Sequence, residues 1–164
     1  QERRIRPGSA PFLKFVQNPL VDDRGYIVSI GDSVPELELE YTTGEKIKLS
    51  SLKGQVTVLQ FTASWCSVCR EEMPHLEEEV WQRFKEEGLV LIGIDRDEPI
   101  ELVQKLIKET GVTYPIALDP GADHFSKFAP KSAGVTRNIV IDKNGKIAFL
   151  TRLFDKKEFQ QTIA

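Results

Sequence analysis

The amino-acid sequence predicts an α/β domain in which a mixed central sheet is flanked by helices. Short apolar runs of strand length alternate with patterns of helical period through the middle of the chain. Two further strand patterns follow, separated by the turn sequence 143–145, and a helical pattern ends the chain. Strands that first alternate with helices and then close in a hairpin are typical of a mixed sheet with helices on its faces.

Length and charge restrict this domain further. The chain has 164 residues, which is the length of one domain, since single domains contain roughly 100–200 residues. The net charge of -3 provides no cationic field for a phosphate backbone, so we expect no nucleic-acid partner. No apolar run approaches the roughly 20 residues that cross a bilayer, and we therefore expect no membrane span in this chain.

The first 30 residues differ in composition from the rest. Several arginines are followed by the loop sequence Pro7-Gly8-Ser9, so residues 1–30 are predicted to form an arm or tether, and residues 31–164 the folded domain. The only methionine is Met73, so a chain that begins at Gln1 has the form expected of an exported precursor after removal of its leader.

A small β extension is expected before the main sheet. Residues 26–30 are rich in β-formers and follow a turn sequence, which predicts a first short strand. Apolar residues alternate with glutamates over residues 37–41, and the turn Thr43-Gly44 leads to further apolar residues at Ile47 and Leu49. This alternation is typical of half-exposed strands.

The main sheet is predicted to begin with residues 56–61. This run is apolar on both faces and too short for a helix, as expected of a buried strand. Apolar residues then recur every three or four positions over residues 66–87, which predicts a long amphipathic helix that ends at Gly88. Pro74 falls inside this helix and is expected to kink it.

A second strand and helix follow at once. Residues 89–94 form another buried apolar run, and the next helix has Pro99 in its first turn and ends near Gly111. The remaining elements are a strand at 115–118, a helical turn at 124–129, a strand at 139–141, its antiparallel partner at 146–151 and a last helix capped by Asp155.

The chemistry of the chain is concentrated in its only two cysteines, which join the strand 56–61 to the helix 66–87 in the sequence Trp65-Cys66-Ser67-Val68-Cys69. Two cysteines at this spacing are too few for a structural disulfide framework. The positive end of a helix dipole lowers the pKa of a cysteine from about 8.5 to roughly 3.5–7. We therefore predict that Cys66 is the nucleophile and that Cys69 resolves the mixed disulfide.

Two other kinds of function compete with this interpretation. The cysteines could form half of a metal site or hold a client without turnover, but the two histidines, His75 and His124, are scattered, and we expect neither a metal nor a cofactor. A thiol peroxidase would instead use Thr62, Ser64 and the arginine beside Thr136 to polarise a peroxide near Cys66.

A set of motifs makes a family resemblance specific. The chain carries Gly31-Asp32-x-x-Pro35, the run 49–54, a strand before Trp65-Cys66, then Cys69 and Glu72-x-Pro74. Over residues 31–164 it resembles the bacterial TlpA/ResA group of thioredoxin-like thiol-disulfide oxidoreductases. The resemblance implies a thioredoxin-like fold with an N-terminal β extension, and reduction of protein disulfides with electrons from a redox donor protein. It also implies the bacterial periplasm or another extracytoplasmic compartment, often with a membrane anchor upstream.

The resemblance also assigns roles to single residues. Cys66 matches the attacking cysteine, Cys69 the resolving cysteine, and Glu72 the acid beside the active site. Because Glu72 lies in a helix with several other glutamates, a solvated position on the helix face is the alternative. Trp65, next to the nucleophile, is expected to form an apolar lip that contacts the partner protein.

The sequence departs from the family at two positions. Gln60 stands where thioredoxin has a buried aspartate and cannot take up a proton, so proton transfer is assigned to Glu72. Thr136 stands where the family has a cis-proline, and we expect it to face Cys66 and contact the substrate. Since a non-proline cis bond costs about 2.5–4 kcal/mol, the Val135-Thr136 bond is predicted to be trans. Arg137 is either an exposed charge or a positive neighbour of the site.

Overall fold

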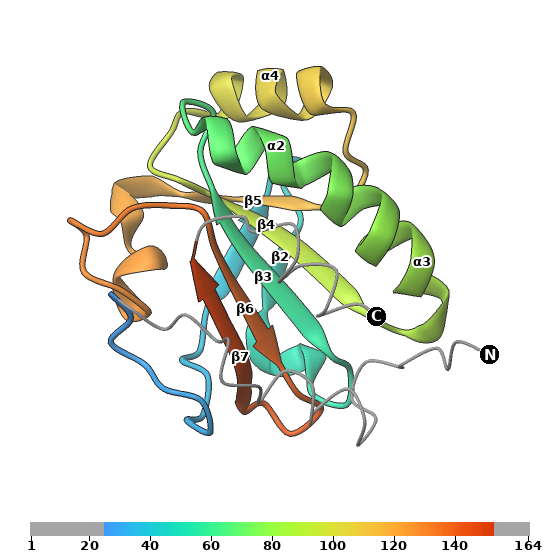
Figure 1. Ribbon diagram of the computed structural model, residues 1–164, viewed down its shortest axis with the longest axis vertical. Coiled ribbons are helices and arrows are strands. Elements are labelled where there is room, and N and C mark those ends of the chain that lie inside the picture. Colours follow the sequence, from blue (N-terminus) through green and yellow to red (C-terminus); the bar gives the residue numbers. More distant parts are fainter. Residues whose placement is uncertain (1–24, 153–164) are drawn as a thin grey trace.

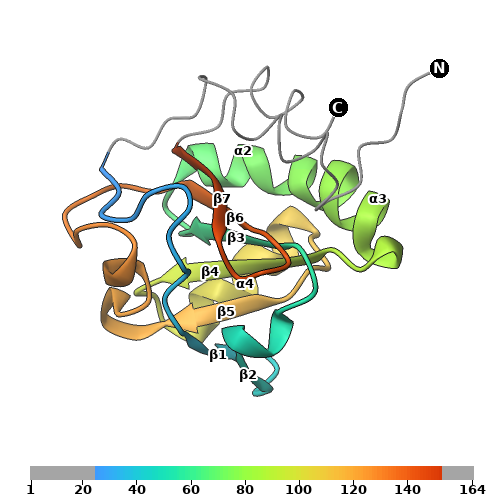
Figure 2. The ribbon, with the colours of Figure 1, turned by 90° about the horizontal axis from the view of Figure 1, so that it is seen from below.

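The computed structural model of the protein describes residues 25–152 and confirms an α/β fold built on a mixed sheet (Figure 1). The strands are β1 (Glu38–Tyr41), β2 (Lys46–Lys48), β3 (Thr57–Thr62), β4 (Val90–Arg96), β5 (Ile116–Asp119), β6 (Arg137–Ile141) and β7 (Ile147–Arg152). Their order is β2-β1-β5-β4-β3-β6-β7, which Figure 2 shows from edge to edge. The neighbours β3, β4 and β5 run parallel, and the other pairs are antiparallel.

Two helical segments cover one face of the sheet. The first consists of α2 (Ser67–His75), a π-helical segment (Leu76–Trp81), α3 (Gln82–Phe84) and a 3₁₀ turn (Lys85–Glu87). The second is α4 (Ile100–Thr110), which lies beside α2 (Figure 1). The helix predicted over residues 66–87 is confirmed in extent but is not a continuous α-helix. The irregular part follows Pro74, whose missing N–H interrupts the helical ladder.

Two apolar cores lie on the two faces of the sheet, because successive side chains of a strand point to opposite faces. On one face, Phe61 of β3 packs edge-to-face against Phe125, with ring centroids 5.3 Å apart. On the other face, Val58 of β3 packs with Met73 of α2. The same period of two places Gln60, a polar residue in the middle of a buried strand, on the face that α2 covers.

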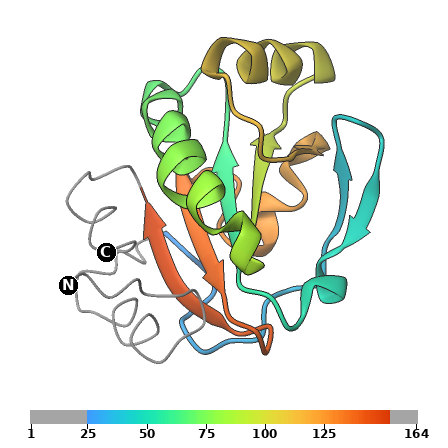
Figure 3. The same ribbon diagram turned by 90° about the vertical axis from the view of Figure 1, so that its right-hand side faces the viewer.

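Most of the predicted elements are confirmed, with ends that differ by one or two residues. The β extension is the hairpin of β1 and β2, which Figure 3 shows at the edge of the sheet away from β7. The predicted helix ends are also correct, since Gly88 and Gly111 adopt left-handed backbone conformations with φ of 89° and 72°.

The strand predicted at residues 26–30 is wrong. These residues are irregular, although they are packed against the sheet: Ile27 donates its N–H to the carbonyl of Phe128 at 2.8 Å, and the Tyr26 hydroxyl donates to the carbonyl of Thr151 at 2.5 Å. Single contacts of this kind satisfy the backbone without a ladder. Most of the predicted arm and the helix expected after Asp155 lie outside the described residues.

Candidate active site

The two cysteines lie where buried strand β3 passes into helix α2. Cys66 is the N-cap residue of α2, with extended backbone angles of -92° and 108°, and its Sγ accepts the N–H of Cys69 at 3.2 Å. The two side chains are joined as a disulfide, with Cα atoms 5.3 Å apart. Because an N–H group of the first helical turn points at Cys66 Sγ, the position suits a thiolate once the disulfide is reduced.

Accessibility distinguishes the two sulfur atoms. Cys66 retains 6% of its surface, whereas Cys69 is completely buried. The neighbouring Trp65 is 67% exposed, which is unusual for a large apolar side chain. Beside Trp65 the surface therefore exposes part of Cys66 and none of Cys69. On its other side, Cys66 Sγ lies 3.7 Å from the carbonyl oxygen of Val135.

Glu72 points into the protein rather than into solvent. It is 1% exposed, so the alternative of a solvated helix face is wrong. Its Oε1 accepts hydrogen bonds from Gln60 Nε2 and from the hydroxyl of Thr136, both at 2.9 Å, and its Oε2 accepts one from Asn138 Nδ2 at 2.7 Å. The partners come from β3, β6 and the residue before β6, so three parts of the chain meet at this carboxyl group.

Tyr114 determines the orientation of the Gln60 amide. The buried Tyr114 hydroxyl donates to Gln60 Oε1 at 2.9 Å, which leaves Nε2 to face Glu72. Burial, with added repulsion from Glu72 and Glu77, raises the pKa of Tyr114 well above its usual value. Tyr114 therefore keeps its proton and acts as a donor throughout the physiological range.

The Val135-Thr136 peptide bond is cis, so the predicted trans geometry is wrong. That prediction weighed only the local cost of the bond and left out tertiary contacts. In the folded chain the Thr136 side chain is 1% exposed, and its hydroxyl lies 2.9 Å from Glu72 Oε1 and 3.3 Å from the carbonyl oxygen of Phe61. The hydroxyl is thus directed at Glu72, and the Val135 carbonyl is the group that lies against Cys66.

Two arginines hold the loop that leads to Thr136. Arg137 is 3% exposed, its Nε donates to the carbonyl of Gly134 at 2.8 Å, and its guanidinium lies 4.7 Å from the ring centroid of Tyr26. Arg137 is therefore not an exposed charge. Arg96, which the sequence analysis missed, donates to the carbonyls of Ala133 and Lys131. A charged residue at the end of a buried strand was its only signal in the sequence.

The residues considered for a peroxidase have other partners. The Thr62 hydroxyl donates to Met73 Sδ at 3.7 Å, and the Ser64 hydroxyl donates to Glu98. Arg137 is held by the Gly134 carbonyl. The two hydroxyls and the guanidinium thus make contacts within the fold, and none of these contacts is with Cys66 Sγ.

A second buried acid, Asp95, was also missed by the sequence analysis. Asp95 lies at the end of β4, opposite Thr62 in β3, and is completely buried. Burial and the neighbouring carboxylates of Glu98 and Asp119 together raise the pKa of Asp95 to about 9. Asp95 is therefore neutral at pH 7. Within residues 25–152 we find no group of three His, Cys, Asp or Glu side chains arranged to hold a metal ion.

Comparisons with known proteins agree with this geometry. The profile of the AhpC/TSA family matches residues 30–150. The thiol-disulfide oxidoreductase ResA of Bacillus anthracis is 31% identical over 120 residues, which cover 73% of this chain and 68% of ResA. A solution structure from Bacteroides thetaiotaomicron, described as that of a protein disulfide isomerase, is 54% identical, covers 85% of this chain and 88% of its own, and superimposes with a TM-score of 0.82.

A more distant structure supports the fold alone. The crystal structure of a thioredoxin-family thiol:disulfide interchange protein from Chlorobium tepidum is 22% identical to this chain. It covers 83% of this chain and 96% of its own, with a TM-score of 0.68. The thioredoxin-like fold predicted from the sequence is therefore confirmed.

Proposed function

The chain belongs to the AhpC/TSA family and is a ResA-like thiol-disulfide oxidoreductase, and from this premise we propose that it reduces protein disulfides through Cys66 and Cys69 in an extracytoplasmic compartment. The observation that carries the proposal is the position of Cys66, at the start of α2 with Sγ accepting the Cys69 N–H at 3.2 Å. This contact stabilises a thiolate and keeps the resolving cysteine within reach.

The proposed cycle begins with both cysteines reduced. The Cys66 thiolate attacks one sulfur of a substrate disulfide, and the other substrate sulfur leaves as a thiolate. Cys69 then loses its proton and attacks Cys66 Sγ, which releases the second substrate thiol and forms the Cys66–Cys69 disulfide. Two electrons have passed to the substrate, and a dithiol donor protein restores the enzyme by the reverse exchange.

Glu72 is the proposed acceptor of the Cys69 proton. Cys69 is completely buried, so its thiol cannot give a proton directly to bulk water. Glu72 follows Cys69 by three positions on α2, and residues at this spacing lie on one helix face. Gln60 carries no titratable group, which leaves Glu72 as the acid of the network described above.

Substrate contact is assigned to the two sides of Cys66. Trp65 provides an exposed apolar surface of the type found at the centre of protein interfaces. The backbone around Val135 and Thr136 lies on the opposite side, since the Val135 carbonyl is 3.7 Å from Cys66 Sγ. The Thr136 hydroxyl contributes indirectly, because it is directed at Glu72.

The family resemblance supports the proposed direction of electron flow and the proposed location. Active-site disulfides of this type have reduction potentials of roughly -270 to -120 mV, and we assign this protein to the reducing end of that range. Within residues 25–152, no helix is long and apolar enough to cross a membrane. We propose the bacterial periplasm or an equivalent compartment, with a membrane anchor upstream as a compatible arrangement.

The proposal is tested by comparing Cys66→Ser with Cys69→Ser. The first variant should lose reduction of insulin disulfides, and the second should accumulate a covalent mixed disulfide that is visible on a non-reducing gel. Equal alkylation rates of the two thiols at neutral pH would contradict the roles assigned here, because only Cys66 is accessible. A measured reduction potential near -120 mV would overturn the direction of electron flow but not the exchange chemistry.

A further inference from the structure

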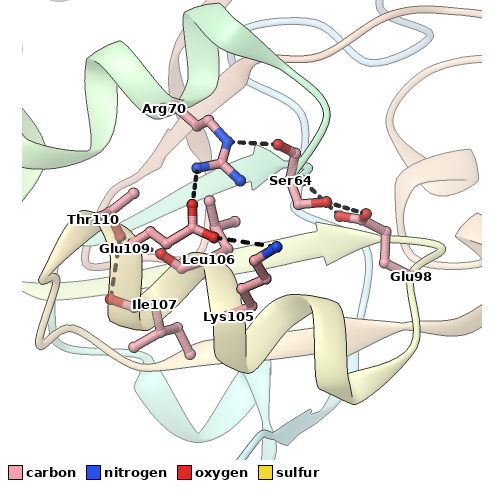
Figure 4. A network of polar contacts seen from close by, with 8 residues as sticks. All are labelled: Ser64, Arg70, Glu98, Lys105, Leu106, Ile107, Glu109 and Thr110. Atoms are coloured by element: carbon pink, nitrogen blue, oxygen red, sulfur yellow. Dashed lines mark hydrogen bonds and ion pairs between the residues drawn. The ribbon is translucent and has the colours of Figure 1, made fainter.

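Ser64, two positions before Cys66, is held by charged side chains at all three of its polar groups (Figure 4). Glu98 accepts the Ser64 N–H with Oε1 at 2.6 Å and the Ser64 hydroxyl with Oε2. Arg70 Nε donates to the Ser64 carbonyl at 2.6 Å. Glu98 precedes α4 and Arg70 lies in α2, so the loop between β3 and α2 is fixed from two directions.

The contacts continue from Arg70 to the other end of α4. The second nitrogen of Arg70, Nη1, donates to Glu109 Oε2 at 3.0 Å, and Lys105 Nζ lies 3.8 Å from Glu109 Oε1 (Figure 4). These pairs are partly exposed and add little stability by themselves. Their effect is to restrict the guanidinium of Arg70 to the orientation in which Nε meets Ser64.

We propose that Glu98 and Arg70 are positioning residues of the oxidoreductase, which hold Ser64 and thereby keep Cys66 in its N-cap geometry with Trp65 outward. The inference rests on the proposed role of Cys66 as the nucleophile. Only Trp65 separates Ser64 from Cys66, so rotation at Ser64 moves the Cys66 Sγ away from the N–H of Cys69. Charge-assisted hydrogen bonds of this type are about twice as strong as neutral ones.

The titratable side chains around Glu98 and Ser64 come from two elements, α2 and β4. Arg70 of α2 lies on the far side of Ser64, and Asp95 of β4 lies close enough for the charge of Glu98 to raise its pKa. Because Asp95 is neutral at pH 7, Glu98 is not opposed by an adjacent buried carboxylate at that pH. An ionised Asp95 therefore does not oppose the contacts of Glu98 with Ser64 at pH 7.

The sign of one measurable shift separates positioning from simple electrostatics. If Glu98 acted only through its charge, its removal would lower the pKa of the Cys66 thiol, because a nearby negative charge disfavours the thiolate. If Glu98 positions the loop, its removal weakens the N-cap contact, and the pKa of the Cys66 thiol rises. The two explanations thus predict opposite directions.

The experiment measures the rate of Cys66 alkylation by iodoacetamide against pH in the reduced Cys69→Ser background, so that a single thiol reacts. The variants are Glu98→Ala, Glu98→Gln and Arg70→Met. Glu101→Gln is the matched control, since it removes one exposed charge from the first turn of α4. Thermal unfolding is recorded for each protein, and KM and kcat for insulin reduction are measured with Cys69 restored.

Glu98→Ala should move the alkylation midpoint upward by about one pH unit, a loss of about 1.4 kcal/mol of thiolate stabilisation. Arg70→Met should shift it in the same direction. Glu98→Gln should shift it less, because the glutamine carbonyl still accepts the Ser64 N–H. KM for insulin should rise severalfold in the Glu98→Ala enzyme as Trp65 loses its orientation, and Glu101→Gln should match the parent protein.

Three results would overturn the inference: a downward shift in Glu98→Ala, equal shifts in Glu98→Ala and Glu101→Gln, or unchanged midpoints and KM in folded Glu98→Gln and Arg70→Met proteins. Failure of the proposed function would look different. In that case the parent protein itself would show Cys66 titrating near an ordinary thiol value of about 8.5, or Cys66→Ser would retain activity.

Discussion

Replacing Thr136 by valine tests the buried network around Glu72 with a minimal change of shape. Valine has nearly the volume of threonine but lacks the hydroxyl that lies 2.9 Å from Glu72 Oε1. Thr136 and Glu72 are both 1% exposed, so water cannot substitute freely for the lost donor. A hydrogen bond to a charged group contributes about 1.5–3 kcal/mol, and we expect the free energy of unfolding to fall by about that amount.

The same change should alter the pH dependence of turnover. Glu72 keeps two donors, Gln60 and Asn138, but loses the third, so its carboxylate form is less well stabilised. We therefore expect the acidic limb of the rate profile for disulfide reduction to move to higher pH by up to about one unit. The assays are urea unfolding at pH 7 and insulin reduction between pH 5 and 9.

Two further variants make the result specific. Thr136→Ser keeps the hydroxyl and should retain the parent pH profile. Thr57→Val makes the same chemical change at a buried threonine, the first residue of β3, and it should leave the pH profile unchanged. If Thr136→Val matched the parent protein in both stability and pH profile, the hydrogen bond to Glu72 would have no part in the reaction.

Three other predictions follow from the same site. Glu72→Gln should shift alkylation of Cys66 to lower pH, since a nearby carboxylate raises the pKa of a thiol, and an unchanged profile would remove Glu72 from the proton pathway. The pKa of Asp95 rises from 3.8 to about 9 on folding, so between these pH values the folded parent protein holds a proton that the unfolded chain has lost. The parent protein therefore loses stability as the pH rises through this range. Asp95→Asn lacks this proton, and its free energy of unfolding relative to that of the parent protein should be higher at pH 8 than at pH 4, by a few kcal/mol in order of magnitude. Urea unfolding at both pH values measures this, and parallel stability curves would contradict it. Trp65→Ala should raise KM for a protein disulfide severalfold and leave the rate with a small disulfide reagent nearly unchanged, so equal losses with both substrates would argue against a docking role.

The sequence alone was sufficient to predict those features that are encoded within short segments of the chain. The period of two in the strands, the helical period after Cys66, and the glycines at positions 88 and 111 are all properties of short segments, and they predicted the order of elements. The sequence around Cys66-x-x-Cys69 also predicted where the motif lies, because a strand pattern ends before it and a helical pattern begins at it. For this reason the class of reaction could be predicted from the sequence, and the roles of Cys66 and Cys69 could be proposed from it.

The tertiary structure decided which polar groups meet across large distances in sequence. Helical period could not select Glu72 from its acidic neighbours as the buried carboxyl, because its partners Gln60 and Asn138 are brought to it by strand register. The cis bond before Thr136 and the hydrogen bond of Ser64 to Glu98 likewise depend on how separate elements pack together. Strand pairing and helix packing create these contacts, and since neither is encoded within a short window of residues, only the folded chain determines the environment in which Cys66 reacts.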